Sequence, residues 1–349
     1  MLRPRRRGFL PGDVVVSDWR LPFTLVMVAA FVAVLPIVMK WTLGVETAQD
    51  YLGTYLELEG QPLWVRQLFG IVLASGTALI TAAVTSVFAY SRRLIPLAVV
   101  TVAIGAALTI AGGGSRMPAM AALLSMIVAY SLIVRSVPMG EAALYGLMLL
   151  GVFAAGQYLR DFLTDDSIDS FAGALVNGEF ASVFINALDM LQQRDWLAAN
   201  GMLPNLYTVD LGRLIPQQLL PFEKLDSSQW YVSTLYPEFA QAGGGLAFGA
   251  VAESAAGLGA LEALVRGGLL GSLFALGHAL LTAPARRSLL SLSAYVWLVV
   301  FSYQSFRDTT FSLVARFAFN AVPALALVAI LERVFRHDDR LRALAHRRR

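Results

Sequence analysis

Residues 22–42, PFTLVMVAAFVAVLPIVMKWT, form an apolar run that contains a single charged residue, Lys40. A helix needs about 20 such residues to cross a hydrocarbon layer of about 30 Å. Similar runs, bounded by charges or by Gly and Pro, recur along the chain, and they predict spans at about 22–42, 68–90, 94–113, 117–135, 141–159, 262–283, 288–304 and 311–333. The sequence therefore predicts an all-α, polytopic helical membrane protein with about eight transmembrane helices.

The composition of the whole chain favours the same class of protein. The 349 residues are 57% hydrophobic and 15% charged, whereas soluble domains are about 25% charged. Cys is absent, which excludes disulfides and thiolate metal sites, and the three His residues are scattered without metal-ligand spacing. The net charge of +3 does not indicate nucleic acid, because the basic residues cluster at the predicted membrane boundaries. We expect no nucleic-acid partner, no metal and no other cofactor.

The distribution of basic residues predicts how the chain crosses the membrane. Cytoplasmic connections are enriched in Lys and Arg. Here both termini and alternate connections are basic, whereas the other connections carry fewer basic residues and most of the acids. We therefore expect both termini in the cytoplasm, and about twenty residues before the first apolar run argue against a cleaved signal peptide. The prediction is a single integral membrane domain, 1–349, whose longest polar stretch, 160–245, is a periplasmic loop between spans five and six.

This loop is too long to be a simple connection and too rich in aromatic residues to be disordered. Residues 178–200, GEFASVFINALDMLQQRDWLAAN, have the apolar period of a helix. We predict one or two short amphipathic helices that lie on the membrane surface.

The few basic residues on the predicted external face are mostly Arg. They are Arg66, Arg116, Arg160, Arg194, Arg213, Lys224 and Arg307, and Arg316 lies about two turns into the last span. An Arg at that depth requires a partner or a watery cavity, and the planar guanidinium fork suits phosphate and pyrophosphate. Two interpretations stay open. The arginines converge on a pyrophosphate group, or they pair with adjacent acids: Arg160 with Asp161, Arg194 with Asp195, and Arg307 with Asp308.

One carboxylate, Glu253, lies in the Gly-rich stretch GGGLAFGAVAESAAGLGALE at 243–262. The glycines weaken a plain spanning helix, and irregular backbone at membrane depth is tolerated beside a cavity. We predict an interrupted, partly re-entrant segment that presents Glu253 to an external cavity. The alternative is a capping or salt-bridging carboxylate, paired with Arg307 or Arg316.

Two further motifs favour a structural interpretation. The stretch TDDSIDS at 164–170 places Asp165, Asp166 and Asp169 at a spacing suited to Mg²⁺ held against pyrophosphate. No second acidic motif faces it, so we interpret it as an acidic loop start or helix cap. His278, late in a predicted span, is interpreted as a helix-packing residue.

Four stretches together resemble a known family. They are AGGGSRMPAMAALL (111–124), LGRLIPQQLLPFEK (211–224), YPEFAQAGGGLAFGAVAESAAGLGALE (236–262) and FSLVARFAFN (311–320). With a large external loop late in the chain, they resemble the Wzy-type oligosaccharide repeat-unit polymerases, the O-antigen and capsule polymerases of bacterial inner membranes, over roughly residues 105–325. The chain departs from the family in its span count, which is usually ten or more. It also departs after the acidic position, where it reads SAAG instead of an aromatic residue and Asn.

The resemblance implies glycosyl transfer at the periplasmic face of the inner membrane, from an oligosaccharide linked to undecaprenyl pyrophosphate and without a nucleotide sugar. It implies that Glu253 is the base for the acceptor hydroxyl and that Arg213 and Arg316 stabilise the departing pyrophosphate. Substrate-binding residues are then Arg116, Arg160, Arg307 and Tyr236. The implied partners are the lipid-linked oligosaccharide, membrane lipids, a chain-length regulator and a flippase.

Other functions stay open. An O-antigen ligase or another polyprenyl-dependent glycosyltransferase carries out the same chemistry, although such ligases usually place a His in the external loop, which has none here. A transporter for lipid-linked sugars requires paired halves and broken helices near the midplane. A non-catalytic scaffold gives no reason for the isolated Arg316 and Glu253.

Overall fold

The computed structural model describes residues 18–43, 61–90, 92–111, 117–147, 151, 179–215, 227–241, 246–282 and 288–347, and within them every regular element is a helix. The chain divides into two compact units. Unit 1 is Met1–Phe153, Gly277–Val300 and Phe319–Arg349, and unit 2 is Ala154–Leu276 and Phe301–Ala318. The prediction of a single membrane domain with a loop at 160–245 stays a prediction.

Five helices of the described chain are long and apolar enough to cross a membrane: Arg20–Thr42, Leu63–Tyr90, Ala260–Leu281, Leu289–Arg307 and Ser312–Phe335. Two shorter apolar helices cover Ile95–Gly105 and Pro118–Val134. These helices coincide with predicted spans and confirm an all-helical chain of the multi-pass membrane type. The count of about eight spans stays a prediction, since most of 148–159 lies outside the described residues.

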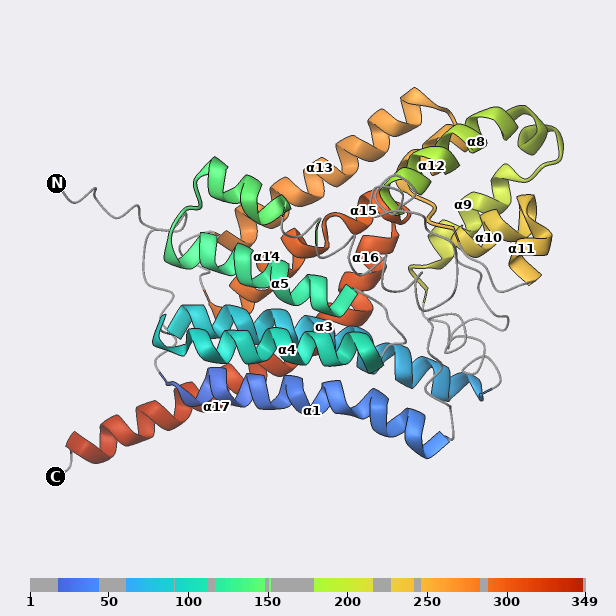
Figure 1. The fold of residues 1–349 in the computed structure, drawn as a ribbon. Helices are drawn as coiled ribbons and strands as arrows, with labels where there is room; N and C mark the ends of the chain where they lie inside the picture. Colours follow the sequence, from blue (N-terminus) through green and yellow to red (C-terminus); the bar gives the residue numbers. More distant parts are fainter. Residues whose placement is uncertain are drawn as a thin grey trace. The chain divides into compact units, whose positions relative to one another are not determined.

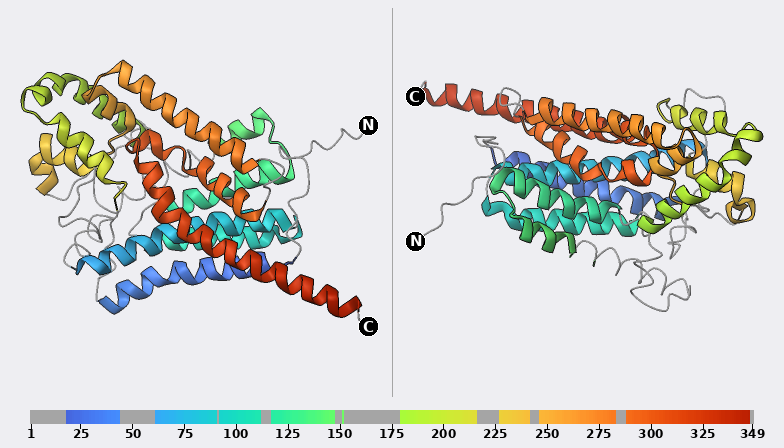
Figure 2. Two further views of the ribbon diagram at one scale, coloured as in Figure 1. Left: turned by 180° about the vertical axis from the view of Figure 1, so that it is seen from behind. Right: turned by 90° about the horizontal axis from the view of Figure 1, so that it is seen from above.

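Unit 1 is built mainly from α1 (Arg20–Leu43), α3 (Leu63–Tyr90), α4 (Ile95–Ala111), α5 (Met117–Ala129) and α17 (Val322–Arg347). The short segment η1 (Arg92–Leu94) joins α3 to α4, and the π-helical η2 (Tyr130–Val134) continues α5. Helices α1, α3 and α4 run side by side, and α3 also packs against α5 and α17 (Figures 1 and 2). The buried face of α3 is rich in Ala and Thr, which lets neighbouring backbones approach closely.

Small and hydroxyl side chains fix these crossings. A Cβ on Gly105 of α4 would lie 2.8 Å from Cβ of Ala122 on α5. Between α3 and α5, the Thr81 and Ser125 hydroxyls form a buried hydrogen bond of 2.9 Å. Because lipid offers no hydrophobic drive for helix association, close packing and such polar contacts hold the helices together.

His278 packs within unit 1, as predicted. It lies in the C-terminal part of α13 (Ala260–Thr282), and its Nδ1 is 2.8 Å from the hydroxyl of Tyr295 on α14 (Leu289–Phe301). The two rings are also in contact, with centroids 5.4 Å apart. These contacts confirm its interpretation as a helix-packing residue.

Unit 2 contains a series of shorter helices. They are α8 (Glu179–Ala199), α9 (Leu203–Gly212), α10 (Ser227–Leu235), α11 (Pro237–Gln241), α12 (Ala250–Ala256), most of α13, α15 (Gln304–Arg307) and α16 (Ser312–Arg316). The π-helical segment η5 (Phe317–Ala321) follows α16 directly. Such π-helical turns are rare and occur frequently at functional sites.

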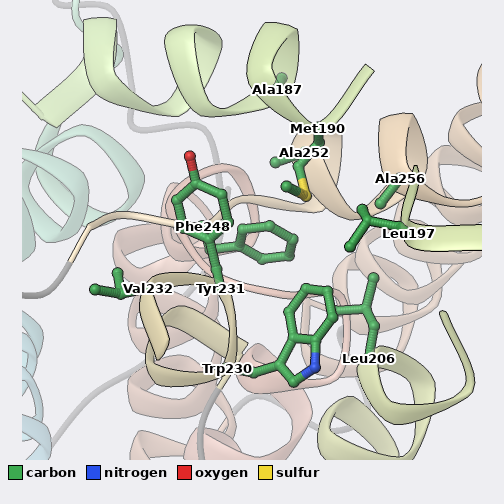
Figure 3. Packing of buried hydrophobic residues seen from close by; sticks show 10 residues of the cluster. All are labelled: Ala187, Met190, Leu197, Leu206, Trp230, Tyr231, Val232, Phe248, Ala252 and Ala256. Carbon is green, nitrogen blue, oxygen red and sulfur yellow. The ribbon is translucent and has the colours of Figure 1, made fainter. Parts of the chain in front are cut away.

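The core of unit 2 is an apolar cluster drawn from four of these helices and the approach to α12. Its residues are Ala187, Met190, Leu197, Leu206, Trp230, Tyr231, Val232, Phe248, Ala252 and Ala256 (Figure 3). The Tyr231 and Phe248 rings lie 5.2 Å apart, while the Tyr231 hydroxyl points out of the cluster (Figure 3). Ala252 and Ala256 anchor one face of α12, so the core fixes the direction in which Glu253 projects.

Helix α8 confirms the predicted helix at 178–200. One face buries Val183 and Met190, but Phe184, Leu188 and Leu191 remain exposed. Its position on a membrane surface stays a prediction.

Candidate functional site

The short turn between α15 and α16 gathers the polar side chains of unit 2. Asp308 follows α15 as its C-terminal cap, with an extended backbone, and α16 begins at Ser312. Four residues apart, the two side chains meet, and Ser312 Oγ donates a hydrogen bond of 2.6 Å to Asp308 Oδ2. The Thr309 N–H donates to Asp308 Oδ1 at 3.1 Å. The turn thus holds the Asp308 carboxylate in one orientation.

Two arginines converge on this carboxylate from separate parts of the sequence. Arg213 Nη1 lies 3.0 Å from Asp308 Oδ1, and Arg316 Nη2 lies 2.7 Å from Asp308 Oδ2. Both guanidinium groups also donate to Ser312 Oγ, at 2.8 Å from Arg213 and 3.3 Å from Arg316. We name Arg213 and Arg316 the arginine pair. The structure therefore brings together the two arginines that the sequence selected separately.

The arginine pair keeps the Asp308 carboxyl group ionised. Burial raises the pKa of Asp308. The charges of Arg316 and Arg213 and the hydrogen bond from Ser312 have the larger, opposite effect and lower the pKa to about 2. The carboxylate is therefore ionised at neutral pH, and two guanidinium groups share it. The Arg316 side chain is 37% exposed and that of Arg213 13%. Arg316 is thus the more accessible member of the arginine pair.

A second cluster surrounds Arg266, about two turns into α13. Arg266 Nη1 donates to Glu253 Oε2 at 2.5 Å and to Thr310 Oγ1 at 2.7 Å, and it lies 3.4 Å from Asp210 Oδ2. Arg266 Nε donates to Glu262 Oε1 at 2.8 Å. We name Asp210, Glu253, Glu262 and Arg266 the buried carboxylate cluster. Its guanidinium occupies the centre of three carboxylates.

Glu262 is held from its other side as well. Its Oε2 accepts hydrogen bonds of 2.8 Å from the Tyr207 hydroxyl and from the Leu258 N–H. Burial, followed by the hydrogen bond to Glu262, raises the pKa of Tyr207 to about 12. Tyr207 therefore stays protonated and donates. Its ring also lies beneath the guanidinium of Arg266, 5.9 Å from the Cζ atom.

Gly257 is required by these close contacts. A Cβ at Gly257 would overlap Glu262 Oε2 and the Tyr207 hydroxyl, and neither atom is the free end of an unrestrained side chain. We expect Gly257→Ala to lower the free energy of unfolding by about 1–3 kcal/mol, in the range of overpacked sites. Thermal unfolding of the purified protein in detergent measures this change.

Gly268→Ala is the matched control, because a Cβ there meets nothing within 4 Å and the residue lies inside helix α13. It should unfold at the same temperature as the wild type or slightly higher, since Ala favours a helix over Gly. Equal unfolding temperatures for the two variants would contradict the packing described at Gly257.

The helix is interrupted in the Gly-rich stretch, as predicted, but Glu253 is not exposed as predicted. Helix α12 ends at Ala256, and the interruption contains Gly259 at a φ of 68°, a conformation that favours glycine. Glu253, however, is 0% exposed, so its predicted presentation to an external cavity is wrong. Its salt bridge is with Arg266 and not with Arg307 or Arg316.

Sequence reasoning missed Asp210, Glu262 and Arg266 of the buried carboxylate cluster, and it also missed the ion pairs of Asp308. Arg266 offered a signal, because a charged residue inside a predicted span requires a partner and Glu262 precedes it by four residues. Asp210 offered none, since its partner lies 56 residues away. Asp308 was considered only as a partner of Arg307, whereas its ion pairs are with Arg213 and Arg316.

The remaining predicted residues lie elsewhere. Arg116, Arg160 and the aspartates of 164–170 lie outside the described residues. Arg307 ends α15, directly before Asp308. Tyr236 is exposed, and its hydroxyl donates to Asp189 Oδ2 at 2.8 Å, as does the Tyr231 hydroxyl at 2.7 Å. No ion pair joins Arg194 to Asp195 in the described part of α8, so that expected pairing is wrong.

Comparisons with protein families, with curated proteins and with solved structures found no match for this chain.

Proposed function

We propose that this chain is a polymerase that joins undecaprenyl-pyrophosphate-linked oligosaccharide repeat units at the periplasmic face of a bacterial inner membrane. The observation that carries the proposal is the arginine pair. Arg213 and Arg316 converge on one carboxylate, and Arg316 is partly exposed. Arg316 also lies near the start of the candidate span Ser312–Phe335, at the depth expected for the headgroup of a lipid.

The pair suits the leaving group of this reaction. The acceptor hydroxyl forms a new bond to the anomeric carbon of the donor sugar, and the bond from that carbon to the pyrophosphate oxygen breaks. Undecaprenyl pyrophosphate leaves with the bonding electrons, so negative charge grows on its oxygens. Guanidinium groups that are already oriented stabilise such charge without reorganisation at the moment of reaction.

The acceptor proton passes to water or to the departing pyrophosphate. Glu253 does not receive it in this proposal, because a carboxyl group with no exposed surface has no contact with a substrate hydroxyl. Arg307 and Tyr236 remain proposed substrate-binding residues. Both lie in unit 2, and the exposed Tyr236 ring has a face that suits a sugar.

The test is the surface polysaccharide ladder of a deletion strain complemented with the wild type, Arg213→Ala or Arg316→Ala. Arg194→Ala is the control, because Arg194 lies in the same unit and has no ion-pair partner among the described residues. Protein levels in the membrane are measured for each strain.

We expect single repeat units in the deletion strain and in both variants of the pair, and normal ladders for the wild type and Arg194→Ala. Normal ladders in both variants of the pair would remove this site from the reaction. A normal ladder in the deletion strain would overturn the polymerase. Full-length chains that accumulate on the lipid carrier in the deletion strain would indicate a ligase instead.

A further inference from the structure

The turn at 308–312 connects the two clusters. Asp308 and Ser312 hold the arginine pair, whereas Thr310, midway between them, is bonded to the buried carboxylate cluster. The Thr310 N–H and Oγ1 donate to Glu253 Oε2 at 3.3 and 3.1 Å. Arg266 donates to Thr310 Oγ1 at 2.7 Å. The buried cluster therefore supports the backbone that orients the arginine pair.

The charges of the buried carboxylate cluster do not balance if every group is ionised. Three carboxylates surround one guanidinium, which would leave two negative charges over. Asp210 and Glu253 have side chains that are only 2% and 0% exposed. Uncompensated charge at such burial is strongly destabilising.

The hydrogen bonds indicate which carboxylate oxygens of the cluster can share a proton. Glu253 Oε2 accepts from Arg266 and twice from Thr310, whereas Glu253 Oε1 has no partner among the described residues. Asp210 Oδ1 is likewise buried without a partner there. Two carboxylate oxygens repel each other, but one proton between them supplies a donor to one and an acceptor to the other.

The groups that face Glu253 favour its protonated, neutral form. From α13 come the Arg266 guanidinium and the Glu262 carboxylate, and from α9 come Asp210 and the protonated Tyr207 hydroxyl. Burial, followed by the neighbouring Asp210 carboxyl group, raises the pKa of Glu253 by more than the Arg266 charge lowers it.

We propose that Glu253 is a neutral positioning residue, which shares one proton with Asp210 and holds Thr310 so that Asp308 and Ser312 keep the arginine pair in place. The test of this proposal by activity rests on the polymerase function proposed above, whereas the test by stability against pH does not. Oε2 of the neutral acid accepts from Arg266 and Thr310, while Oε1–H donates to Asp210.

Glu253→Gln tests the neutral state directly. Gln has the same shape, its carbonyl oxygen accepts from Arg266 and Thr310, and its amide donates to Asp210. We expect repeat-unit transfer within about 3-fold of the wild type for Gln and a loss of about 10-fold or more for Ala, which leaves buried donors without a partner. If Glu253 were the base, Gln would lose about 100-fold or more, and that result would overturn the proposal.

The positioning role is tested by two adjacent threonines. Thr310→Val removes the hydroxyl that bonds Glu253, whereas Thr309→Val removes a buried hydroxyl without a partner in the described chain. We expect kcat/KM for repeat-unit transfer to fall about 10-fold or more in Thr310→Val, because small misplacements of catalytic groups are costly. Thr309→Val should match the wild type. Equal values for the two variants would show that the contact does not position the pair.

The proton itself is tested by stability against pH. Because the folded pKa of Glu253 is raised, the folded state binds a proton that the unfolded state loses above the ordinary carboxyl value of 4.5. The stability from this group is fully present below 4.5 and is lost as pH rises through the folded pKa.

The unfolding temperature of the wild type, measured in detergent, should therefore fall with pH above 4.5 more steeply than that of Glu253→Gln. Parallel curves would overturn the shared proton. This measurement needs no substrate, so it is decided even if the chain has no polymerase activity.

Discussion

Replacing Arg316 by Ala should lower the rate of repeat-unit transfer by about 10²–10³-fold, the loss typical of removing one preorganised donor to a developing negative charge. Arg316 is the more exposed member of the arginine pair, and in the proposed function it is the one that contacts the leaving pyrophosphate. The measurement is release of undecaprenyl pyrophosphate by the purified protein, supplied with lipid-linked repeat units in vesicles.

Arg316→Lys separates charge from geometry. Lysine keeps the positive charge but not the planar fork that bonds Asp308, Ser312 and a phosphate together, so its rate should lie between those of Ala and the wild type. Arg194→Ala, the control on α8, should keep the wild-type rate. An Arg316→Ala protein that is folded and transfers repeat units at the wild-type rate would exclude Arg316 from the reaction.

Replacing Arg266 by Ala should destabilise the protein by about 3–5 kcal/mol, the cost typical of breaking a buried ion pair on one side. Among the residues that the structure describes, Arg266 is the only cation paired with Asp210, Glu253 and Glu262, and its loss leaves the charge of this cluster without compensation. Denaturant unfolding in detergent, or the amount of folded protein in membranes, measures the effect.

Arg135→Ala is the matched control, because Arg135 also pairs with a carboxylate, Glu141, but both side chains are far more exposed than those of the cluster, at 42% and 35%. Such surface pairs contribute little, so this variant should unfold close to the wild type. Adding Glu253→Gln to Arg266→Ala should recover none of the loss, because Glu253 is already neutral, whereas adding Glu262→Gln should recover part of it. Recovery by Glu253→Gln alone would indicate that Glu253 is ionised.

The long apolar helices were predictable because a helix of about 20 apolar residues matches the thickness of a bilayer. The run at 22–42 became the helix Arg20–Leu43, and the run at 68–90 lies within Leu63–Tyr90. Helix α8 was predictable from the amphipathic period at 178–200, because the residues on the buried face of a helix recur with each turn. These features depend on neighbours within a few residues.

The site was only partly predictable, because its contacts join distant residues. Arg213 and Arg316 were selected as scarce external arginines, but nothing local indicated that Asp308, 95 residues from Arg213, lies between them. Arg266 was not selected, because a span is recognised from its average hydropathy, which one charged residue barely changes. The burial of Glu253 follows from the packing of Ala252 and Ala256 into the core, and a Gly- and Ala-rich sequence does not show which face will pack.

The C-terminal end of α9 carries one residue of the buried carboxylate cluster, Asp210, and is capped by one residue of the arginine pair, Arg213. The Arg213 N–H donates a hydrogen bond to the Asp210 carbonyl. The proposed anion at the pair and the proposed proton in the cluster would therefore be two ligands of one segment of the chain. Thermodynamic linkage makes their effects reciprocal. If pyrophosphate alters the proton affinity of the cluster, pH alters the affinity for pyrophosphate by the same factor, and proton uptake during titration with pyrophosphate measures both.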